Sequence, residues 1–302
     1  MPELPEVETV RRTLLPYLPG RVIEEVEVRP SLRSQAVKSG LLVLLHPSPE
    51  EFAGRLRGQP FEALERHGKL LDFRLPDQHL LIHLGMTGQL TFRDPARADE
   101  PFNRHPKTGL ERSLQHPVDQ HTHISFRFTD GTHLHYRDIR KFGKWRLYRH
   151  GDPALAQEFA KLGPDPLTPT FTLNDFGARL KATQRAIKAT LLDQAVVAGV
   201  GNIYADEALH RAGIHPLAHA QRLSRKSVAA LFEAVRHVLE LGLSNRGTSL
   251  SDYVDGEGRS GTNQEALRAY GRGGEPCLAC GTTMLRIVVA QRTTTFCPKC
   301  QK

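Results

Sequence analysis

The first residues of the chain could supply a nucleophile. Pro2 is small enough for Met1 to be removed normally, which would leave a free secondary amine on Pro2. A terminal amine titrates near pH ~7.7–8.0, far below lysine at about 10.4, so a useful fraction is uncharged at neutral pH. Such an amine can form a cationic Schiff base with a sugar aldehyde carbon, and Glu3 places a carboxylate beside it. From this stretch alone, a common Met-Pro start followed by helix-favouring acids is the preferred interpretation.

The four cysteines form a pattern typical of a zinc site. Cys277 and Cys280 make one C-x2-C pair, and Cys297 and Cys300 make a second pair after sixteen intervening residues. Two such turns complete a tetrahedron with Zn–S distances near ~2.3 Å, and a site closed by four cysteines is structural. The β-branched residues between the pairs predict a hairpin. Two disulfides are the alternative, which the cytoplasm disfavours.

Three further positions could contact a phosphate. Gly199-Val200-Gly201 leads into Asn202 at the start of an expected helix, where backbone N–H groups and the helix dipole favour an anion. Arg292 follows the tip of the expected hairpin and could fork onto a phosphate. Lys69 lies where a strand begins. The alternatives are an ordinary helix–helix turn, a solvated arginine and a solvated edge lysine.

Two turns carry apolar side chains, one of them next to two cations. Met86 lies in the turn His83–Gly88, and Phe142 follows Arg140 and Lys141. Apolar wedges and an arginine can fill the hole that remains when a damaged base is flipped out of a duplex. For Met86 and Phe142 considered alone, packing in the core is the better interpretation.

Two histidine pairs have the spacing of one strand face. They are His121 with His123 and His133 with His135, and this spacing could suggest a metal site. Because an organised zinc site is already expected elsewhere, we interpret these histidines as structural or DNA-facing.

The elements that must position these residues differ between the two halves of the chain. Residues 5–18 predict a helix with Pro5 at its first position, so Pro2 and Glu3 should lie at a helix entrance. Residues 93–120 carry four prolines and are typical of a long, mobile surface loop. The rest of 22–148 predicts short strands, whose spacing suggests a β-sandwich: Val22–Val28, Leu41–Leu45, Leu70–Leu75, Leu80–Leu84, Gln89–Phe92, His123–Phe128 and Thr132–Tyr136.

The pattern turns helical after residue 165. Thr172 and Asp175 predict a capped helix start, residues 202–212 a second helix, and Ser224 the cap of a third. One apolar face is expected to contain Phe176, Leu180, Ile187 and Leu191. We therefore expect an α+β protein with a β-sandwich over 1–150, a linker over 151–165, a helical domain over 166–272 and a zinc hairpin over 273–302.

Composition favours a soluble protein with a polyanionic partner. The 302 residues suffice for two domains, and 39% of them are hydrophobic, with a mean hydropathy of −0.40. The net charge of +8 and the pI of about 9.5 suit nucleic acid, although many basic proteins bind none. No apolar run approaches the ~20 residues that span a bilayer, and the N-terminus lacks a signal-peptide pattern. We expect a cytoplasmic protein that binds no membrane.

Five motifs, in order along essentially the whole chain, resemble those of the formamidopyrimidine-DNA glycosylases, bacterial repair enzymes for oxidised purines. The resemblance implies an N-terminal catalytic β-sandwich with a flanking helix, a helix–two-turn–helix DNA-binding domain and a C-terminal zinc finger. It also implies one structural zinc ion and a monomer that binds double-stranded DNA with an oxidised base or an abasic site. The motifs are Met1–Glu8, Arg66–Lys69, the paired turns at 83–88 and 138–143, Gly199–Glu207, and the zinc hairpin with Ala290–Phe296.

The resemblance implies a bifunctional DNA glycosylase and apurinic-site lyase that removes 8-oxoguanine and formamidopyrimidines. Pro2 would attack the sugar C1′ and displace the base, while Glu3 supplies and takes protons around ring opening. The resulting iminium acidifies the C2′ hydrogens, so β-elimination and then δ-elimination cut both flanking phosphodiesters. Lys69 and Arg292 would neutralise those phosphates as they leave.

The resemblance also assigns contacts with DNA. The three hole-filling residues of the family match Met86, Arg140 and Phe142. With this match, filling the hole becomes the preferred interpretation of Met86 and Phe142 over packing in the core. Asn202 matches an asparagine that binds a phosphate next to the damaged base. Lys141 stands where arginine is common, which keeps the charge. The DNA-binding residues that the resemblance implies are Met86, His121, Arg140, Lys141, Phe142, Lys188 and Asn202.

Two features depart from the family pattern. The 93–120 insert is longer than we expect. The loop Asp255–Asn263, which closes over the flipped base in the family, lacks the aromatic residue that usually follows its last glycine. This departure bears on recognition of 8-oxoguanine rather than on catalysis.

Two other functions explain part of the pattern. Endonuclease VIII, the sister enzyme for oxidised pyrimidines, shares Pro2 and Glu3, but its N-terminal string and hole-filling residues differ from those here. A non-catalytic zinc protein that binds DNA explains the charge, the hairpin and the glycine-rich turn equally well. It gives no reason for Pro2-Glu3 at the N-terminus.

Overall fold

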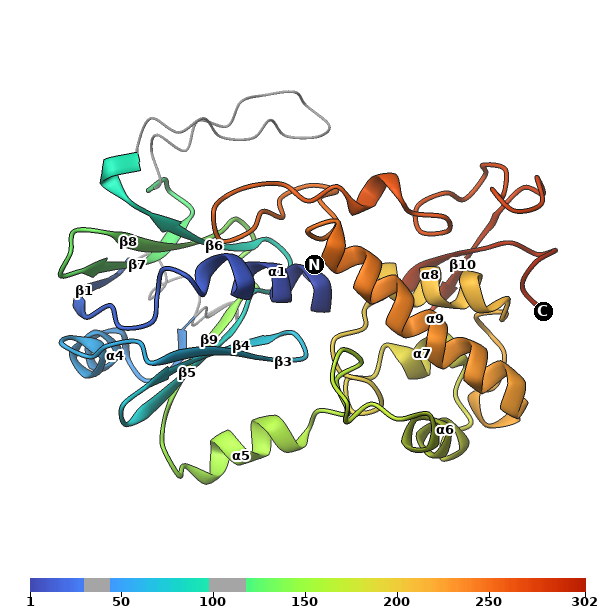
Figure 1. Ribbon diagram of the computed structural model, residues 1–302, viewed down its shortest axis with the longest axis horizontal. Coiled ribbons are helices and arrows are strands. Elements are labelled where there is room, and N and C mark those ends of the chain that lie inside the picture. The colour runs from blue at the N-terminus through green and yellow to red at the C-terminus, as the bar shows by residue number, and fades with distance from the viewer. Residues whose placement is uncertain (30–43, 98–117) are drawn as a thin grey trace. The chain divides into compact units, whose positions relative to one another are not determined.

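The computed structural model describes residues 1–29, 44–97 and 118–302 (Figure 1). They form two compact units, Met1–Gln157 with Asn245–Gln264, and Glu158–Ser244 with Glu265–Lys302. Residues 245–264 therefore pack with the N-terminal unit, whereas we expected them in the helical domain. Most of the expected loop over 93–120 and the first part of the expected strand Leu41–Leu45 lie outside the described residues.

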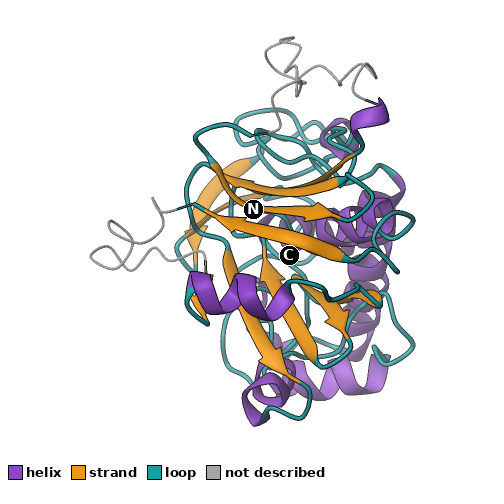
Figure 2. Ribbon diagram, turned by 90° about the vertical axis from the view of Figure 1, so that its left-hand side faces the viewer, coloured by secondary structure: helices purple, strands orange, loops and turns teal. Residues whose placement is uncertain are grey.

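The first unit contains two β-sheets, which form separate layers in Figures 1 and 2. One sheet is antiparallel, in the order β1 (Ile23–Val28), β7 (Thr122–Phe128), β8 (His133–Asp138) and β6 (Gly88–Arg93). In the other sheet β2 and β9 pair in parallel and the remaining pairs are antiparallel. Its order is β2 (Leu44–His46), β9 (Lys144–Arg149), β5 (Gln78–His83), β4 (Leu70–Leu75) and β3 (Ala63–His67). The predicted β-sandwich is confirmed, although the prediction lacks β3, β9 and helix α4 (Pro49–Leu56).

Aromatic side chains connect the two layers. The Phe61 ring lies 5.3 Å from the ring of Phe73 in the five-stranded sheet and 5.9 Å from that of Phe126 in the four-stranded sheet. Trp145 is fully buried and its ring lies 6.0 Å from Phe126. Burial of each such side chain contributes about 1.5–3 kcal/mol. The aromatic core therefore holds the two sheets, and the turns at their edges, in fixed positions.

Helix α1 (Leu4–Leu14) carries the N-terminal residues. Its buried side chains Val7 and Val10 face the core, and the helix contacts β3 and β4 of one sheet and β6 of the other. The prediction extended this helix to residue 18. The helix ends at Leu14 because Pro16 has no N–H with which to continue the hydrogen-bond ladder.

The second unit contains helices and the predicted hairpin. Thr172 caps the first of these helices by accepting a hydrogen bond from the Asp175 N–H over 3.2 Å, as predicted. The apolar face expected over 176–191 is divided between two helices, because a turn separates them. The elements are α6 (Leu173–Lys181), α7 (Ile187–Leu191), α8 (Asn202–Ala212), α9 (Arg225–Ser244), and the antiparallel strands β10 (Leu285–Val289) and β11 (Arg292–Phe296).

Shorter elements complete the described chain. Helix α5 (Pro153–Ala160) occupies the expected linker and crosses the division between the units at residue 157. Three 3-10 turns span Pro95–Arg97, Ala220–Arg222 and Asn263–Glu265. Among the residues that the structure describes, no helix is long and apolar enough to cross a membrane.

Candidate functional site

Pro2 and Glu3 lie buried at the start of α1. Glu3 is 2% exposed and forms a capping box with Glu6, in which the Glu3 N–H donates to Glu6 Oε2 over 2.8 Å. A capping box satisfies backbone donors that the first turn of a helix leaves without partners. The packed helix therefore holds both predicted catalytic residues at a fixed position.

Glu6 also joins the start of α1 to residues 245–264. Its Oε1 accepts a hydrogen bond from the Thr248 N–H over 2.7 Å, and its backbone carbonyl accepts one from the Tyr253 hydroxyl over 3.3 Å. Gly247 has a φ of +85°, and a Cβ on it would lie 2.9 Å from Glu6 Cγ, so this approach requires glycine. The sequence predicts for Glu6 only that it favours the helix, as one of the acids after the Met-Pro start. The Glu3-x-x-Glu6 spacing could have indicated the cap, but no local pattern indicates the contact with Thr248.

An ionic network connects α1 to the β3–β4 turn, which carries Lys69. The Arg66 Nε lies 2.9 Å from Glu8 Oε2, and both side chains are almost fully buried. Burial alone would raise the pKa of Glu8, but hydrogen bonds from Arg11 and Arg12, together with Arg66, lower it to about 2. Lys69 itself is 8% exposed. The network thus fixes the turn that carries Lys69 to the helix whose start carries Pro2 and Glu3.

The turns that carry Met86 and Phe142 pack backbone against backbone. Gly85 has a φ of +68°, and a Cβ on it would lie 2.5 Å from the Gly143 nitrogen. Met86 is 40% exposed, and the Arg140 guanidinium lies 4.6 Å from the centre of the Phe142 ring. This distance allows a cation–π interaction. The structure therefore brings the three predicted hole-filling residues to one pair of adjoining turns.

Asp138 holds both turns through its carboxylate. Oδ1 accepts hydrogen bonds from the Thr87 hydroxyl over 2.5 Å and from the Arg140 N–H over 3.2 Å. Oδ2 accepts them from the Gly143 N–H over 2.8 Å and from the Tyr136 hydroxyl over 3.0 Å. Asp138 has no exposed surface, so these donors replace its hydration. This role was not predicted, because nothing in the alternating strand indicates that an acid at its end is buried.

Three of the four predicted histidines lie on the four-stranded sheet, and His121 lies in the turn directly before its strand β7. His121 is half-buried, and its backbone carbonyl accepts a hydrogen bond from the Asp138 N–H over 2.9 Å. His123 is buried, with its Nε2 2.8 Å from the Asp138 carbonyl oxygen. His135 lies 3.0 Å from the Ser125 hydroxyl, and burial lowers the pKa of His135 to about 4. His123 and His135 thus have structural contacts.

In the second unit, Asn202 and Arg292 lie on connected elements. The glycine turn leads directly into α8, with Gly201 as its N-cap residue. Asn202 Nδ2 donates a hydrogen bond to the Thr293 carbonyl over 3.0 Å, which ties α8 to β11. An amide nitrogen carries two N–H groups, so this bond is compatible with a second one to a phosphate. Arg292 is exposed directly after a two-residue turn with positive φ angles, as in a type I′ hairpin.

Lys188, which was predicted to bind DNA, is buried among protein groups. Its side chain has no exposed surface, and its Nζ lies 2.6 Å from Asp206 Oδ1 and 2.7 Å from the Thr294 hydroxyl. Asp206 Oδ2 also accepts a hydrogen bond from the Thr295 N–H over 3.0 Å. Burial raises the pKa of Asp206 to about 6, although Lys188 acts in the opposite direction. Lys188 therefore joins α7, α8 and the strand that begins at Arg292.

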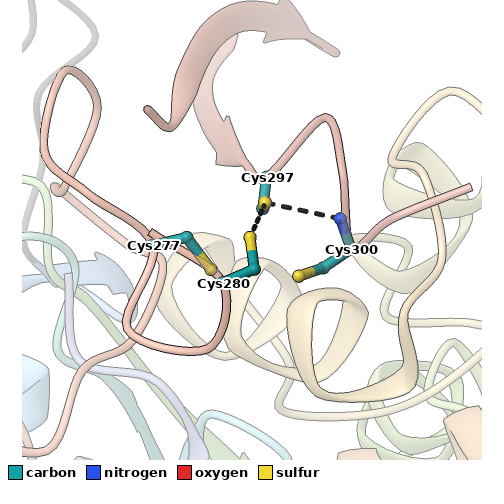
Figure 3. A group of neighbouring side chains, drawn as sticks. All are labelled: Cys277, Cys280, Cys297 and Cys300. Carbon is teal, nitrogen blue, oxygen red and sulfur yellow. Dashed lines mark hydrogen bonds between the residues drawn. The ribbon is translucent and has the colours of Figure 1, made fainter. Parts of the chain in front are cut away.

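The four cysteine sulfurs converge on one space in the second unit (Figure 3). They all lie within 4.8 Å of one another, and the Cys280 and Cys297 sulfurs are 3.5 Å apart. Zn–S bonds near ~2.3 Å require sulfur separations of about 3.8 Å in a tetrahedron. His210 Nε2 lies 3.5 Å from the Cys277 sulfur, as an outer partner would. The cluster fits one structural zinc ion.

The thiols of this cluster compete for ionisation. Hydrogen bonds from Thr282 lower the pKa of Cys280 to about 6. Hydrogen bonds to Cys280 and Cys297 raise the pKa of Cys300 to about 12. A divalent cation stabilises all four thiolates at once, which is why such a cluster binds zinc with release of protons.

Family models match most of the chain. They are the formamidopyrimidine-DNA glycosylase N-terminal domain over residues 1–145, the H2TH domain of the same enzymes over 162–254, and the zinc finger found in FPG and IleRS over 274–302. The formamidopyrimidine-DNA glycosylase of Herpetosiphon aurantiacus is 47% identical over 304 residues, with 100% of both chains covered. This chain belongs to the formamidopyrimidine-DNA glycosylase family. The Geobacillus kaustophilus member is 41% identical, again over 100% of both chains.

Solved structures of family members share the fold. A complex of Lactococcus lactis Fpg with DNA containing an abasic site has a TM-score of 0.82 and 32% identity, and 99% of each chain is covered. The MutM (Fpg) protein from Thermus thermophilus has a TM-score of 0.80 and 35% identity, over 99% of this chain and 98% of that one. The predicted family, the α+β architecture and the zinc finger are confirmed. Membership assigns the chain to the DNA glycosylases of base excision repair.

Proposed function

We propose that this member of the family is a bifunctional glycosylase and lyase that removes oxidised purines from duplex DNA. The observation that carries the proposal is Pro2-Glu3 at the buried, capped start of α1. The similar Lactococcus lactis structures contain DNA with an abasic site or Fapy-dG, which supports the same class of substrate here. The net charge of +8 favours association with a polyanion.

The reaction begins with the Pro2 amine after removal of Met1. The amine attacks C1′ of the damaged nucleotide, the bond from C1′ to the base breaks, and Glu3 protonates the sugar ring oxygen as the ring opens. The iminium then withdraws electrons from C2′. Loss of a C2′ proton breaks the C3′–O bond in β-elimination, and δ-elimination breaks the C5′–O bond. Lys69 and Arg292 offset the charge of the departing phosphates.

Met86, Arg140 and Phe142 fill the space that the flipped nucleotide leaves. Their turns are already held by the Asp138 carboxylate, so little ordering is needed when DNA binds. The four cysteines would hold zinc, which supplies a structural link that closes the hairpin and presents Arg292. These side chains explain flipping and strand scission without any further cofactor.

Borohydride trapping on a duplex with 8-oxoguanine opposite cytosine tests the proposal. We expect a covalent adduct that mass spectrometry locates on Pro2. Suppose that Met1 has been removed, so that Pro2 is the terminal residue, and that the protein binds DNA tightly without forming an adduct. This result would support the non-catalytic zinc protein instead. Stronger trapping on an oxidised pyrimidine than on 8-oxoguanine would support an endonuclease VIII-like enzyme.

A one-residue extension provides the matched control. An alanine inserted between Met1 and Pro2 converts the Pro2 nitrogen into an amide, so strand cleavage should be abolished. An alanine added after Lys302 should leave cleavage unchanged. Equal cleavage by the two extended proteins would contradict Pro2 as the nucleophile.

A further inference from the structure

We propose that the outer face of the β3–β4 hairpin binds a second divalent metal ion of the zinc class, through Glu65, His67 and Asp72. One carboxylate oxygen from each acid and one imidazole nitrogen lie within 4.8 Å of one another. This site belongs to the first unit, whereas the four cysteines belong to the second. The proposal does not depend on the proposed enzymatic function.

The strand register brings the three ligands together. Glu65 of β3 pairs directly with Asp72 of β4, and His67 follows Glu65 by two residues. Side chains two residues apart leave the same face of a strand, so all three point to one side of the sheet. Two acids directly opposite each other destabilise a strand pair. A cation bound between the two carboxylates would replace their repulsion by attraction to the ion.

The distances suit metal ligands better than hydrogen bonds. His67 Nε2 lies 3.8 Å from Glu65 Oε2 and 3.8 Å from Asp72 Oδ2. Both separations exceed hydrogen-bond range. Ligand atoms in a tetrahedral zinc site with bonds of about 2.1 Å are about 3.4 Å apart. The His67 nitrogen therefore needs to approach each carboxylate oxygen by only a few tenths of an ångström, and the two carboxylate oxygens, which lie within 4.8 Å of each other, complete the site by closing around the ion.

Neighbouring groups orient both carboxylates. Arg74 NH1 donates a hydrogen bond to Glu65 Oε1 over 3.0 Å, which leaves Oε2 as the oxygen nearer His67. His79 Nδ1 lies 2.9 Å from Asp72 Oδ2 and 3.0 Å from Oδ1. Outer hydrogen bonds of this kind hold ligands in place and commonly account for 10–100-fold in metal affinity.

The site has a buried base and an open side. The Asp72 side chain is 1% exposed, whereas those of His67 and Glu65 are 34% and 46% exposed. An ion can therefore enter from solvent and keep water as its fourth ligand. An imidazole with two carboxylates suits zinc and its neighbours, whereas magnesium and calcium prefer sites made of oxygen alone. The alternative is a cluster that the Arg74 and His79 contacts hold without an ion, and it predicts no metal uptake.

Metal titration distinguishes these two possibilities. The full chain, loaded with one zinc at the cysteines, is titrated with zinc chloride in a calorimeter at pH 7.5, and its metal content is measured by mass spectrometry. We expect one additional equivalent of zinc. Glu65→Gln and His67→Gln should each weaken its binding by about 100-fold or more, since loss of a ligand exceeds loss of an outer partner. Glu62→Gln removes an exposed acid one residue before β3 and should leave binding unchanged.

Two results would overturn the proposal. One is the absence of a second equivalent in the wild-type protein, and the other is a second equivalent that survives both ligand substitutions. Circular dichroism and retention of the cysteine-bound zinc verify that the variants fold. If His67→Gln does not fold, Glu65→Gln decides the question, because the Glu65 side chain is nearly half exposed.

Discussion

At the scale of single residues, two buried carboxylates position the backbone of the candidate site. Asp138 accepts hydrogen bonds from the turns of Met86 and Phe142, and Glu6 accepts them from the start of α1 and from Thr248. A carboxylate can accept several hydrogen bonds in fixed directions, and in a dry environment each is stronger than in water. Both acids are therefore positioning residues rather than reacting groups.

Asp138→Asn should destabilise the protein and loosen the hole-filling turns. The new amide nitrogen would face donors such as Gly143 N–H, so buried groups lose their acceptor at a cost of about 2–3 kcal/mol. Urea unfolding measures the stability, and trapping rates on lesion DNA measure the effect on the site. Asp77→Asn, at an exposed acid in the turn between β4 and β5, should change neither quantity. Unchanged stability and trapping in Asp138→Asn would refute the positioning role.

His83 should make stability depend on pH. Burial, followed by the charges of Lys69, Lys144 and Arg146, lowers the pKa of His83 to about 4, from about 6.5 in an unfolded chain. The unfolded state therefore takes up the proton first. The contribution of His83 is complete above pH ~6.5 and is lost as the pH falls from there towards 4. Neutral His83 accepts a hydrogen bond from the Gly85 N–H over 3.0 Å, so its protonation also disturbs the Met86 turn.

Urea unfolding of wild-type protein and His83→Gln between pH 7.5 and 4.5 isolates this effect. The free energy of unfolding of the wild type should fall more steeply below pH 6.5, by up to ~1.4 kcal/mol per pH unit for one proton. Parallel profiles for the two proteins would show that His83 does not titrate in this way.

At the scale of elements, the ion pair of Lys188 and Asp206 joins two helices to the zinc hairpin. Removal of one partner of a buried pair leaves an uncompensated charge and costs about 3–5 kcal/mol. Lys188→Met should therefore destabilise the second unit strongly, and Lys188→Met combined with Asp206→Asn should recover part of the loss. Denaturant unfolding of the single and double variants gives the coupling energy.

An exposed pair provides the comparison. Lys161 lies 3.0 Å from Glu158 on the surface, so Lys161→Met should change stability by less than about 1 kcal/mol. Strictly additive losses in the Lys188 and Asp206 variants would indicate that the two side chains do not depend on each other.

At the scale of the whole molecule, the two units contain separate cores. The four cysteines belong to a small cluster with Ala269 and Met284, and Trp145, the single tryptophan, lies in the core of the first unit. A cluster this small depends on its metal for stability. Zinc therefore stabilises the second unit specifically.

Removal of zinc should lower the melting temperature of the second unit only. We expect calorimetry of the Cys280→Ser variant to show a transition that is lowered or lost, while Trp145 fluorescence reports an unchanged transition for the first unit. Trp145 has no exposed surface, so its emission follows the sandwich core directly. If the temperatures of the calorimetric transition and of the Trp145 fluorescence transition fell by the same amount, the two units would unfold together.

Features that depend on the spacing of nearby residues could be predicted from the sequence. The cysteine pairs, the alternating strands, the capped start at Thr172 and the Pro2-Glu3 start of a helix all depend on residues close together in the chain. Their geometry follows from the backbone, so the fold class and the zinc ligands could be predicted. The sequence also indicated the family, because its motifs lie in the right order.

The burial of charged groups and the identity of their partners became clear only from the folded chain. Glu6 accepts a hydrogen bond from Thr248, which lies 242 positions later in the sequence. Lys188 donates one to Thr294, which lies 106 positions later. Burial of a charge depends on partners that distant segments bring to it, and no local pattern encodes them. For this reason the burial of Lys188 beside Asp206, and the packing of residues 245–264 with the sandwich, could not be predicted. The convergence of Glu65, His67 and Asp72 likewise depends on strand register, which is decided only when β3 pairs with β4.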